Sequence, residues 1–402
     1  MNRASFLAIL AFAAITSGVP AAPPVKGHLV IAGGGLGPME KSPVHARIKA
    51  LLGPTAKMGV VPTASGEDQA YFEETVRDFQ GFVGGAAGRV SLVPLTTSTA
   101  ARAFEPAVAD GIRACGSLYF VGGDQSRILQ TFRPKDKGFD SPAYKAAMDV
   151  LGAGGTIAGS SAGAAMMSDP MLTGGASATA LRVGAYDRYI ADDGEAERRG
   201  VGIGRGMGFF PFGLTDQHFL KRGRLGRLVA ALEATTTTMG FGVDERRGID
   251  VDLATGKVDT LGTAALLLVN RTDATRSADG LTRKGIRVSL LGGGDTCDAR
   301  TGAATPASGA VMAPAPKPSR MASVLPGDGP FAANQVIEAV RFLHDSLGSA
   351  AVLQGGDWKF TFSADARTRL WHAPGDPAAV GAADVALDIE PMDAAVAKVA
   401  AK

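Results

Sequence analysis

The most constraining feature of this chain is a repeated order of short apolar run, glycine-rich turn and helical stretch. Residues 68–82, for example, form a predicted helix with Tyr71, Phe72, Val76 and Phe79 on one apolar face. Strands that are apolar throughout, with helices between them, are typical of a mostly parallel sheet covered on both faces. The predicted strands are His28–Ala32, Met58–Pro62, Val90–Pro94, Ser117–Val121 and Thr156–Ala158.

Three of these strands end in glycine-rich sequences. The sequences are GGG at 33–35, GGDQ at 122–125 and GSSAGA at 159–164. In open α/β sheets, ligands bind beyond the carboxyl ends of the strands. We therefore expect a binding site where these three turns meet.

The segment Gly159–Gly163 has the form G-x-S-x-G directly after a predicted strand and before a helical run. A sharp turn at this place would hold Ser161 above the sheet as a nucleophile, with the backbone N–H of Ala162 aimed at a developing oxyanion. The alternative is a Gly-Ser turn that merely closes a buried strand. The position at a strand end favours the catalytic interpretation.

A serine nucleophile needs a base, and His218 has the most suggestive setting of the five histidines. It lies in the sequence DQHF and precedes a basic run. A carboxylate should orient its imidazole, and Asp244 and Glu245 follow an apolar stretch at another strand end. The order Ser, His, acid differs from the Ser, acid, His order of α/β-hydrolases. The other histidines are His28 at a strand start, His45 on a predicted surface helix, His344 in a late helix and His372 in a Pro/Gly-rich segment.

The basic run begins just after His218 and has helical spacing of its leucines. An ordinary solvated helix face is one interpretation. Its nearness to the candidate base favours another, a cationic rim for a carboxylate-rich substrate, because arginine binds carboxylates with two parallel hydrogen bonds. The run consists of Lys221, Arg222, Arg224 and Arg227.

Composition narrows the function further. Lys+Arg exceed Asp+Glu by only two, 41 against 39, so overall charge gives no reason to expect nucleic acid as a partner. Two cysteines, Cys115 and Cys297, exclude a disulfide-rich scaffold and a cysteine-based zinc cluster, and could form one bridge. Without a metal-ligand cluster or a P-loop motif in the sequence, we expect no metal and no cofactor.

Residues 1–21 read as a secretory signal peptide. Arg3 precedes the apolar run FLAILAFAAI, and small residues follow at Val19–Ala22. A buried N-terminal helix is the alternative. Because no other run approaches the length of a membrane span, we expect a secreted or periplasmic protein that does not cross a membrane.

The later chain changes character. Strand-like runs recur at 264–269 and 286–291, and a helix is predicted at 335–347. Residues 301–325 are rich in Pro, Ala and Gly and are predicted to be a linker or exposed loop. We therefore divide the chain into a catalytic α/β domain at 27–300 and a small C-terminal extension at 326–402.

The motifs GSSAGA, GGDQ, DQHF followed by R-x-R-x-x-R, and a strand-end glutamate together resemble the cyanophycinases, in the S51 group of serine peptidases. The segment Val60–Ser65 is similar to the same family. The resemblance covers about residues 27–300. It implies a class I glutamine amidotransferase-like (flavodoxin-like) three-layer α/β sandwich with a mostly parallel central sheet, and a homodimer. It also implies cleavage of multi-L-arginyl-poly-L-aspartate, a peptide polymer rich in Asp and Arg, into β-Asp-Arg dipeptides.

The resemblance also implies roles for particular residues. Ser161 would be the nucleophile, His218 the base and Glu245 its orienting acid, with the backbone of Gly123 and Ala162 as oxyanion hole. The substrate-binding residues that it implies are Gln125, Asp216, Gln217, Arg222, Arg224 and Arg227.

The chain departs from the family pattern in the tail after residue 321, in Arg246-Arg247-Gly248 after the acid, and in Ser160, where Thr is more usual. Two other functions therefore stay open. One is a related S51 peptidase that acts on other aspartyl or isoaspartyl peptides. The other is a non-catalytic binding protein with the same fold.

Overall fold

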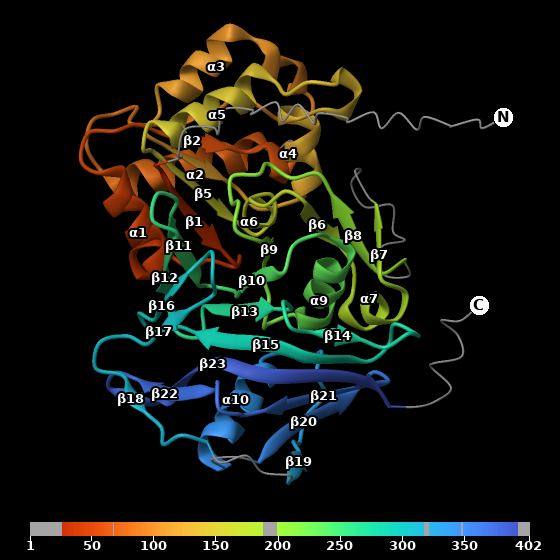
Figure 1. Ribbon diagram of the computed structural model, residues 1–402. Coiled ribbons are helices and arrows are strands. Elements are labelled where there is room, and N and C mark those ends of the chain that lie inside the picture. The colour runs from red at the N-terminus through yellow and green to blue at the C-terminus, as the bar shows by residue number, and fades with distance from the viewer. Residues whose placement is uncertain (1–25, 67, 188–198, 317–320, 347–348, 393–402) are drawn as a thin grey trace, which may run out of the picture.

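Two large β-sheets form the centre of the molecule in the computed structural model (Figure 1). The predicted signal peptide, residues 1–21, lies outside the described residues. Within the described part of the chain, no helix has the length and apolar character needed to cross a membrane. The structure describes residues 26–392 except 67, 188–198, 317–320 and 347–348.

The first sheet has the strand order β17-β16-β12-β11-β1-β5-β4-β2-β3. The five strands from β1 to β3 in this order are parallel to one another, as predicted, while the other four add antiparallel neighbours on the side of β1. The parallel strands are β1 (His28–Ala32), β2 (Met58–Val61), β3 (Val90–Leu92), β4 (Ser117–Phe120) and β5 (Thr156–Ser160). The antiparallel strands are β11 (Gly248–Asp252), β12 (Lys257–Leu261), β16 (Thr296–Asp298) and β17 (Ala304–Thr305).

Helices cover both faces of the parallel strands. On β1, Leu29 and Ile31 belong to one buried cluster and Val30 and Ala32 to another, because successive side chains point to opposite faces. The first cluster includes side chains of α3, α4 and α5, and the second includes side chains of α1 and α2. This arrangement confirms the predicted three-layer α/β fold and explains why the strands are apolar throughout. The helices are α1 (Pro43–Leu52), α2 (Gln69–Val83), α3 (Pro106–Arg113), α4 (Gln125–Phe132) and α5 (Pro142–Gly152).

Two residues on the α1–α2 side differ from expectation. The prediction put His45 on a surface helix, but its side chain is buried, with 4% of its area exposed. Tyr71, predicted on the apolar face of its helix, is 42% exposed. The prediction for these two residues was wrong, because the packing of α1 against α2 and not the helix period alone decides which positions are covered.

The second sheet has the order β19-β20-β21-β23-β15-β13-β10-β9. One of its faces adds Leu266 and Leu268 to the cluster shared with the first sheet, and the other adds Leu267 and Val269 to a cluster with α9 and α10. The elements not yet introduced are β9 (Leu214–Asp216), β10 (Met239–Val243), β13 (Leu266–Asn270), β15 (Arg283–Leu291), β20 (Ala350–Gly355), β21 (Trp358–Ser363), β23 (Asp376–Pro391), α9 (Leu225–Ala234) and α10 (Gln335–Ser346).

The C-terminal segment joins this sheet at its centre. β23, from the predicted extension, pairs antiparallel with β15 from the predicted catalytic domain. Strands from both sides of the predicted linker therefore share one continuous sheet, and α10 packs beneath it in Figure 1. The described part of the linker forms loops with short strands. These are β17, β18 (Val311–Met312), which pairs with β22 (Arg369–Ala373), and β19 (Ala322–Val324).

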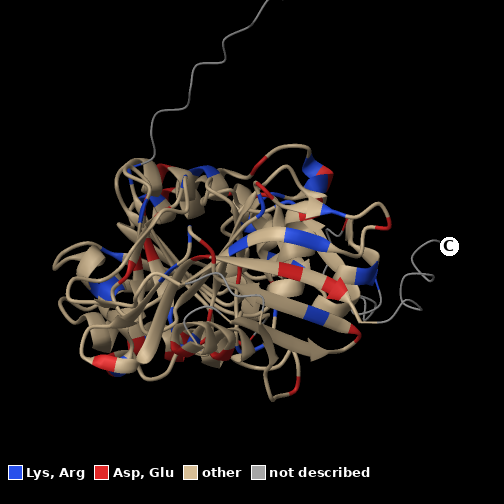
Figure 2. Ribbon diagram, turned by 60° about the horizontal axis from the view of Figure 1, so that its bottom comes forward, with Lys and Arg blue, Asp and Glu red and all other residues tan. Residues whose placement is uncertain are grey.

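A third, small sheet lies beside the other two in the order β6-β8-β7. Cys115 and Cys297, whose pairing the sequence left open, are both buried free thiols. Acidic and basic residues are scattered over the ribbon in Figure 2, in keeping with the small net charge. The remaining elements near the site are β6 (Met171–Gly174), β7 (Ala185–Asp187), β8 (Val201–Gly204), α6 (Ala162–Ala165) and α7 (Ser177–Val183).

Candidate active site

Ser161 stands on the sharp turn between β5 and α6. Its backbone has φ 55° and ψ −110°, a region that residues with a side chain rarely occupy and that marks functional sites. Its N–H donates to the Ala32 carbonyl at 3.1 Å. A Cβ on Gly159 would lie 2.2 Å from the Gly163 carbonyl oxygen, so the turn closes only with glycine there. The G-x-S-x-G pattern thus has a physical cause, which is the tight elbow that presents the serine.

His218 follows β9 and faces this serine. Its Nε2 lies 2.9 Å from the Ser161 Oγ, and its backbone N–H donates to the Gly33 carbonyl at 2.7 Å. A Cβ on Gly34, where φ is 101°, would lie 2.3 Å from the imidazole Nε2. The GGG turn after β1 therefore makes room for the imidazole. The sequence marked this turn only as part of a binding site.

Glu245 follows β10 and completes a chain of three side chains. Its Oε1 lies 2.6 Å from the Nδ1 of His218. Because a carboxylate can only accept here, Nδ1 carries the proton and Nε2 is free to accept one from Ser161. The neighbouring Asp244 has a different function, since its buried Oδ1 accepts the backbone N–H of Lys221 and ties the basic run to this turn.

The surroundings of His218 favour its neutral form. Burial lowers the pKa of the imidazole, the hydrogen bond to Glu245 opposes that change, and the cation of Arg222 lowers the pKa further. The net direction is below the ordinary histidine value. A neutral imidazole beside a serine hydroxyl is the protonation state that a general base requires.

Two backbone N–H groups were predicted to bind an oxyanion. Ala162 is the first residue of α6, so its N–H has no partner within the helix. Gly123 lies in the turn between β4 and α4, where a Cβ would meet the Ala64 carbonyl oxygen at 2.0 Å. A Cβ on the adjacent Gly122 would lie 3.9 Å from the Ser161 Oγ. The structure thus brings this turn to the serine, while the oxyanion role stays a prediction.

Asp216 and Arg227 bind each other deep in the site. Arg227 Nε donates to Asp216 Oδ2 at 2.8 Å and Nη2 to Oδ1 at 2.5 Å, while Nη1 donates to the Gly175 carbonyl at 3.1 Å. Asp216 has no exposed area and Arg227 only 4%. The pair therefore holds the end of β9 against α9. Direct contact of either side chain with a substrate stays a prediction.

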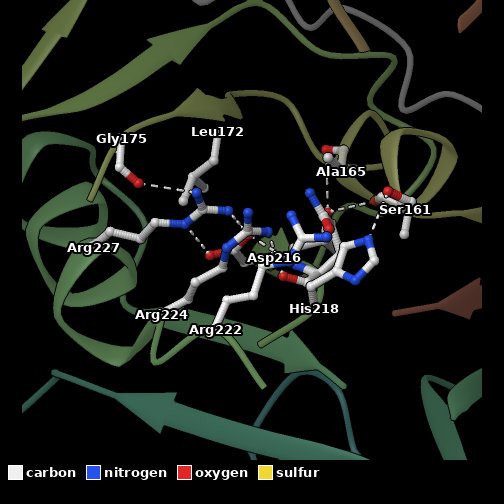
Figure 3. Close-up of polar contacts among 12 residues, drawn as sticks. Ser161, Ala165, Leu172, Gly175, Asp216, His218, Arg222, Arg224 and Arg227 are labelled. Carbon is white, nitrogen blue, oxygen red and sulfur yellow. Dashed lines mark hydrogen bonds and ion pairs between the residues drawn. The ribbon is translucent and has the colours of Figure 1, made fainter. Parts of the chain in front are cut away.

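The other two arginines of the run, Arg224 and Arg222, lie between Arg227 and His218 in Figure 3 and differ in exposure. Arg224 Nη1 donates to the Gln217 carbonyl at 2.7 Å, and its side chain is 14% exposed. Burial, and next the charge of Arg227, lower the pKa of Arg224 to about 9. Arg222 is 53% exposed, with its Nε 3.7 Å from Glu245 Oε1. An incoming carboxylate would relieve the crowding of positive charge around Arg224.

The two predicted glutamines are buried near the same residues. Gln125, the first residue of α4, donates its Nε2 to the Leu172 carbonyl at 2.8 Å. The Oε1 of Gln217 is buried and has no hydrogen-bond partner among the described residues. That oxygen is an available acceptor beside the arginines.

A cavity of about 450 Å³ opens at Ser161 and His218. Its walls come from the loop after β1, from α1 and from α2. Among the described residues, no group of three or more His, Cys, Asp or Glu side chains is placed to hold a metal ion. The arrangement of Ser161 and His218 in this cavity is suited to nucleophilic attack by a serine with a histidine as its base.

Comparison with known proteins gives the following relatives. No protein-family model matches the chain. It is 27% identical over 275 residues to a cyanophycinase of Trichormus variabilis, which covers 60% of this chain and 85% of that protein. It is 26% identical over 257 residues to a cyanophycinase of Synechococcus elongatus, covering 61% of this chain and 70% of that protein.

Among solved structures, a peptidase from an acI-B1 Actinobacterium has a TM-score of 0.46 and 17% identity, covering 70% of this chain and 97% of that one. The sequence similarities confirm the predicted resemblance to the cyanophycinases, and with it the prediction of a peptidase-class hydrolase.

Proposed function

We propose that this protein is a serine peptidase of the cyanophycinase kind that cleaves multi-L-arginyl-poly-L-aspartate to β-Asp-Arg dipeptides. The observation that carries the proposal is the continuous chain of hydrogen-bond distances from Ser161 through His218 to Glu245, 2.9 Å and 2.6 Å. The similarity to cyanophycinases of two organisms supports the substrate class. The guanidinium groups of Arg222 and Arg224, close to Glu245 and Asp216, support recognition of a carboxylate-rich polymer.

In this mechanism the Ser161 Oγ attacks the scissile carbonyl carbon while His218 Nε2 takes its proton. The N–H groups of Gly123 and Ala162 stabilise the negative charge that develops on the carbonyl oxygen. His218 then gives the proton to the leaving amine as the carbon–nitrogen bond breaks and an acyl-enzyme forms. Water, activated by the same imidazole, releases the acid and restores Ser161. Glu245 keeps the imidazole oriented and stabilises its protonated form.

The proposal is tested by incubating the protein with insoluble cyanophycin and analysing the released dipeptides. The wild type should release β-Asp-Arg. Ser161→Ala should lower the rate by about 10⁴-fold or more, because the covalent route is lost, with unchanged folding by circular dichroism. Ser160→Ala, its neighbour in the same turn, is the matched control and should change the rate far less. Normal turnover by Ser161→Ala would overturn the serine mechanism.

The alternative substrates are other aspartyl or isoaspartyl peptides. Hydrolysis of these peptides without hydrolysis of cyanophycin, in the same assay, would identify them as the substrates. A binding protein without activity would show no hydrolysis of either. The close approach of all three side chains favours an enzyme, because a chain that had lost catalysis has no need to keep a 2.9 Å and a 2.6 Å contact in series.

Location and assembly are further parts of the proposal. Residues 1–21 support a secreted or periplasmic protein, and the resemblance to cyanophycinases supports a homodimer. Fractionation of expressing cells tests the first, and light scattering of the purified protein tests the second.

A further inference from the structure

The cavity at Ser161 extends away from the arginine run. None of Arg222, Arg224 and Arg227 lines it, although it reaches both Ser161 and His218. A substrate bound across the serine would thus place one part beside the arginines and another part in this cavity. None of the substrate-binding residues predicted from the sequence lines this cavity, so none of them accounts for binding of the second part.

One wall of the cavity is a single face of α2. Tyr71, Thr75, Asp78 and Phe79 all line it, at helical positions i, i+4, i+7 and i+8. A second, apolar part of the lining includes Leu36 from the loop after β1 and Met39 from the short helix that follows it. The cavity therefore combines an apolar wall with a carboxylate and a phenol.

The fixed charge of the cavity is negative. Asp78 is exposed and takes part in no ion pair within the described part of the chain, and no lysine or arginine lines the cavity. His45 also lines it, and burial lowers the pKa of His45 to about 4, so the imidazole is neutral near pH 7. Its Nδ1 is buried and has no hydrogen-bond partner among the described residues.

We propose that this cavity binds the guanidinium-tipped side chain of an arginine in the substrate, with Asp78 as its counter-ion. The inference rests on the proposed function and names a specificity-determining residue for it. An arginine side chain has an apolar stem and a planar cation at its end, which match the wall of Leu36 and Met39 and the carboxylate of Asp78. The partly exposed ring of Tyr71 can add a cation–π contact.

The binding regions on the two sides of Ser161 would then recognise groups of opposite charge in one substrate. The arginine run receives carboxylates, and the cavity lined by α2 receives the guanidinium. A polymer of β-Asp-Arg units presents both groups in every unit. Lysine would be accepted less well than arginine, and an uncharged side chain of the same shape poorly, because the carboxylate of Asp78 would then have no cation beside it.

The test uses a short oligomer of β-Asp-Arg units and its counterpart with citrulline, which replaces the guanidinium by an uncharged urea of nearly the same shape. Binding of both to Ser161→Ala protein is measured by calorimetry at low salt. The arginine oligomer should bind at least about tenfold more tightly. Asp78→Asn in the same background should remove most of that discrimination.

Glu73→Gln is the matched control, because it removes one negative charge from the same helix, where Glu73 lies on the exposed side near Gln69 and Arg77. It should keep the discrimination. Equal binding of the two oligomers to the parent protein, or discrimination that survives Asp78→Asn, would overturn the proposal.

Hydrolysis of cyanophycin by the wild type is scored separately. Hydrolysis without dependence of binding on Asp78 refutes the arginine site alone. Discrimination that depends on Asp78, without hydrolysis, refutes the proposed function alone.

Discussion

The two sheets contribute to the candidate site in different ways. The first sheet supplies Ser161 from the end of β5, within a parallel arrangement whose order follows from local strand–helix units. The second supplies His218 after β9 and Glu245 after β10, and its other strands include β23 from the C-terminal segment. The candidate nucleophile thus follows a strand that lies between two parallel neighbours, β1 and β4, whereas the candidate base and acid follow β9 and β10, which pair with each other at the end of the second sheet. The three candidate catalytic side chains come within hydrogen-bond distance of one another where the two sheets meet.

The loop after β1 joins the two contributions. Gly33 accepts the backbone N–H of His218, and its own N–H donates to the Arg247 carbonyl at 3.0 Å. Gly34 accepts the backbone N–H of Arg246 at 2.8 Å. The C-terminal segment reaches the same region, since the Asn334 N–H donates to the Leu220 carbonyl at 3.0 Å. The second sheet is therefore positioned by the first at the site itself.

The largest effect is expected when the imidazole that the second sheet contributes to the site is removed. His218→Ala should lower kcat on a small activated ester by about 10³-fold or more, because Ser161 then has no base, while the serine turn itself stays folded. His372→Ala is the control, since His372 lies in β22 of the same sheet and contacts the ring of His344, not Ser161. Comparable losses in both variants would show that the sheet and not the imidazole limits the rate.

A smaller effect is expected from loosening the end of β9. Arg227→Ala leaves the buried carboxylate of Asp216 with only Arg224, whose Nη1 lies 3.9 Å from Oδ1, as a cationic partner, and should lower the free energy of unfolding by about 3 kcal/mol, measured by urea denaturation. Arg222→Ala, with a half-exposed side chain, should cost less than about 1 kcal/mol. If the two variants were equally stable, the distinction between a structural and a solvent-facing arginine would fail.

The smallest effect concerns the pH dependence of activity, which the protonation of His218 in the second sheet should set. Since the pKa of His218 lies below its usual value of 6.5, activity should rise with pH along a limb centred below 6.5 and exceed half of its maximum at pH 7. Arg222 holds this pKa down, so Arg222→Ala should let it rise. The acid limb of kcat/KM would then move to higher pH, by less than about one unit. A shift to lower pH would contradict the assigned electrostatics.

The serine turn could be predicted because everything it needs is local. Gly159 and Gly163 permit the close approach, and an apolar strand precedes Ser161 directly. His45 was mistaken for a surface residue, although Val44, Ile48 and Leu52 on the same helix mark the buried face that it borders. The cavity lined by α2 had no such signal, because a polar residue on the exposed part of a helix looks the same with or without a cavity beside it.

The amino-acid sequence by itself determined the parallel strands with their covering helices and the elbow at Ser161, because apolar runs and glycine positions act over a few residues. Only the tertiary structure decided how the basic run divides. Arg227 turns inward to Asp216 while Arg222 stays half exposed near Glu245, although both stand in the same short segment. It also decided that β23 completes the second sheet and that Asp78 faces the cavity at Ser161. These are contacts between distant parts of the chain. Their energies depend on how deeply the groups are buried, and a local sequence pattern does not specify that burial.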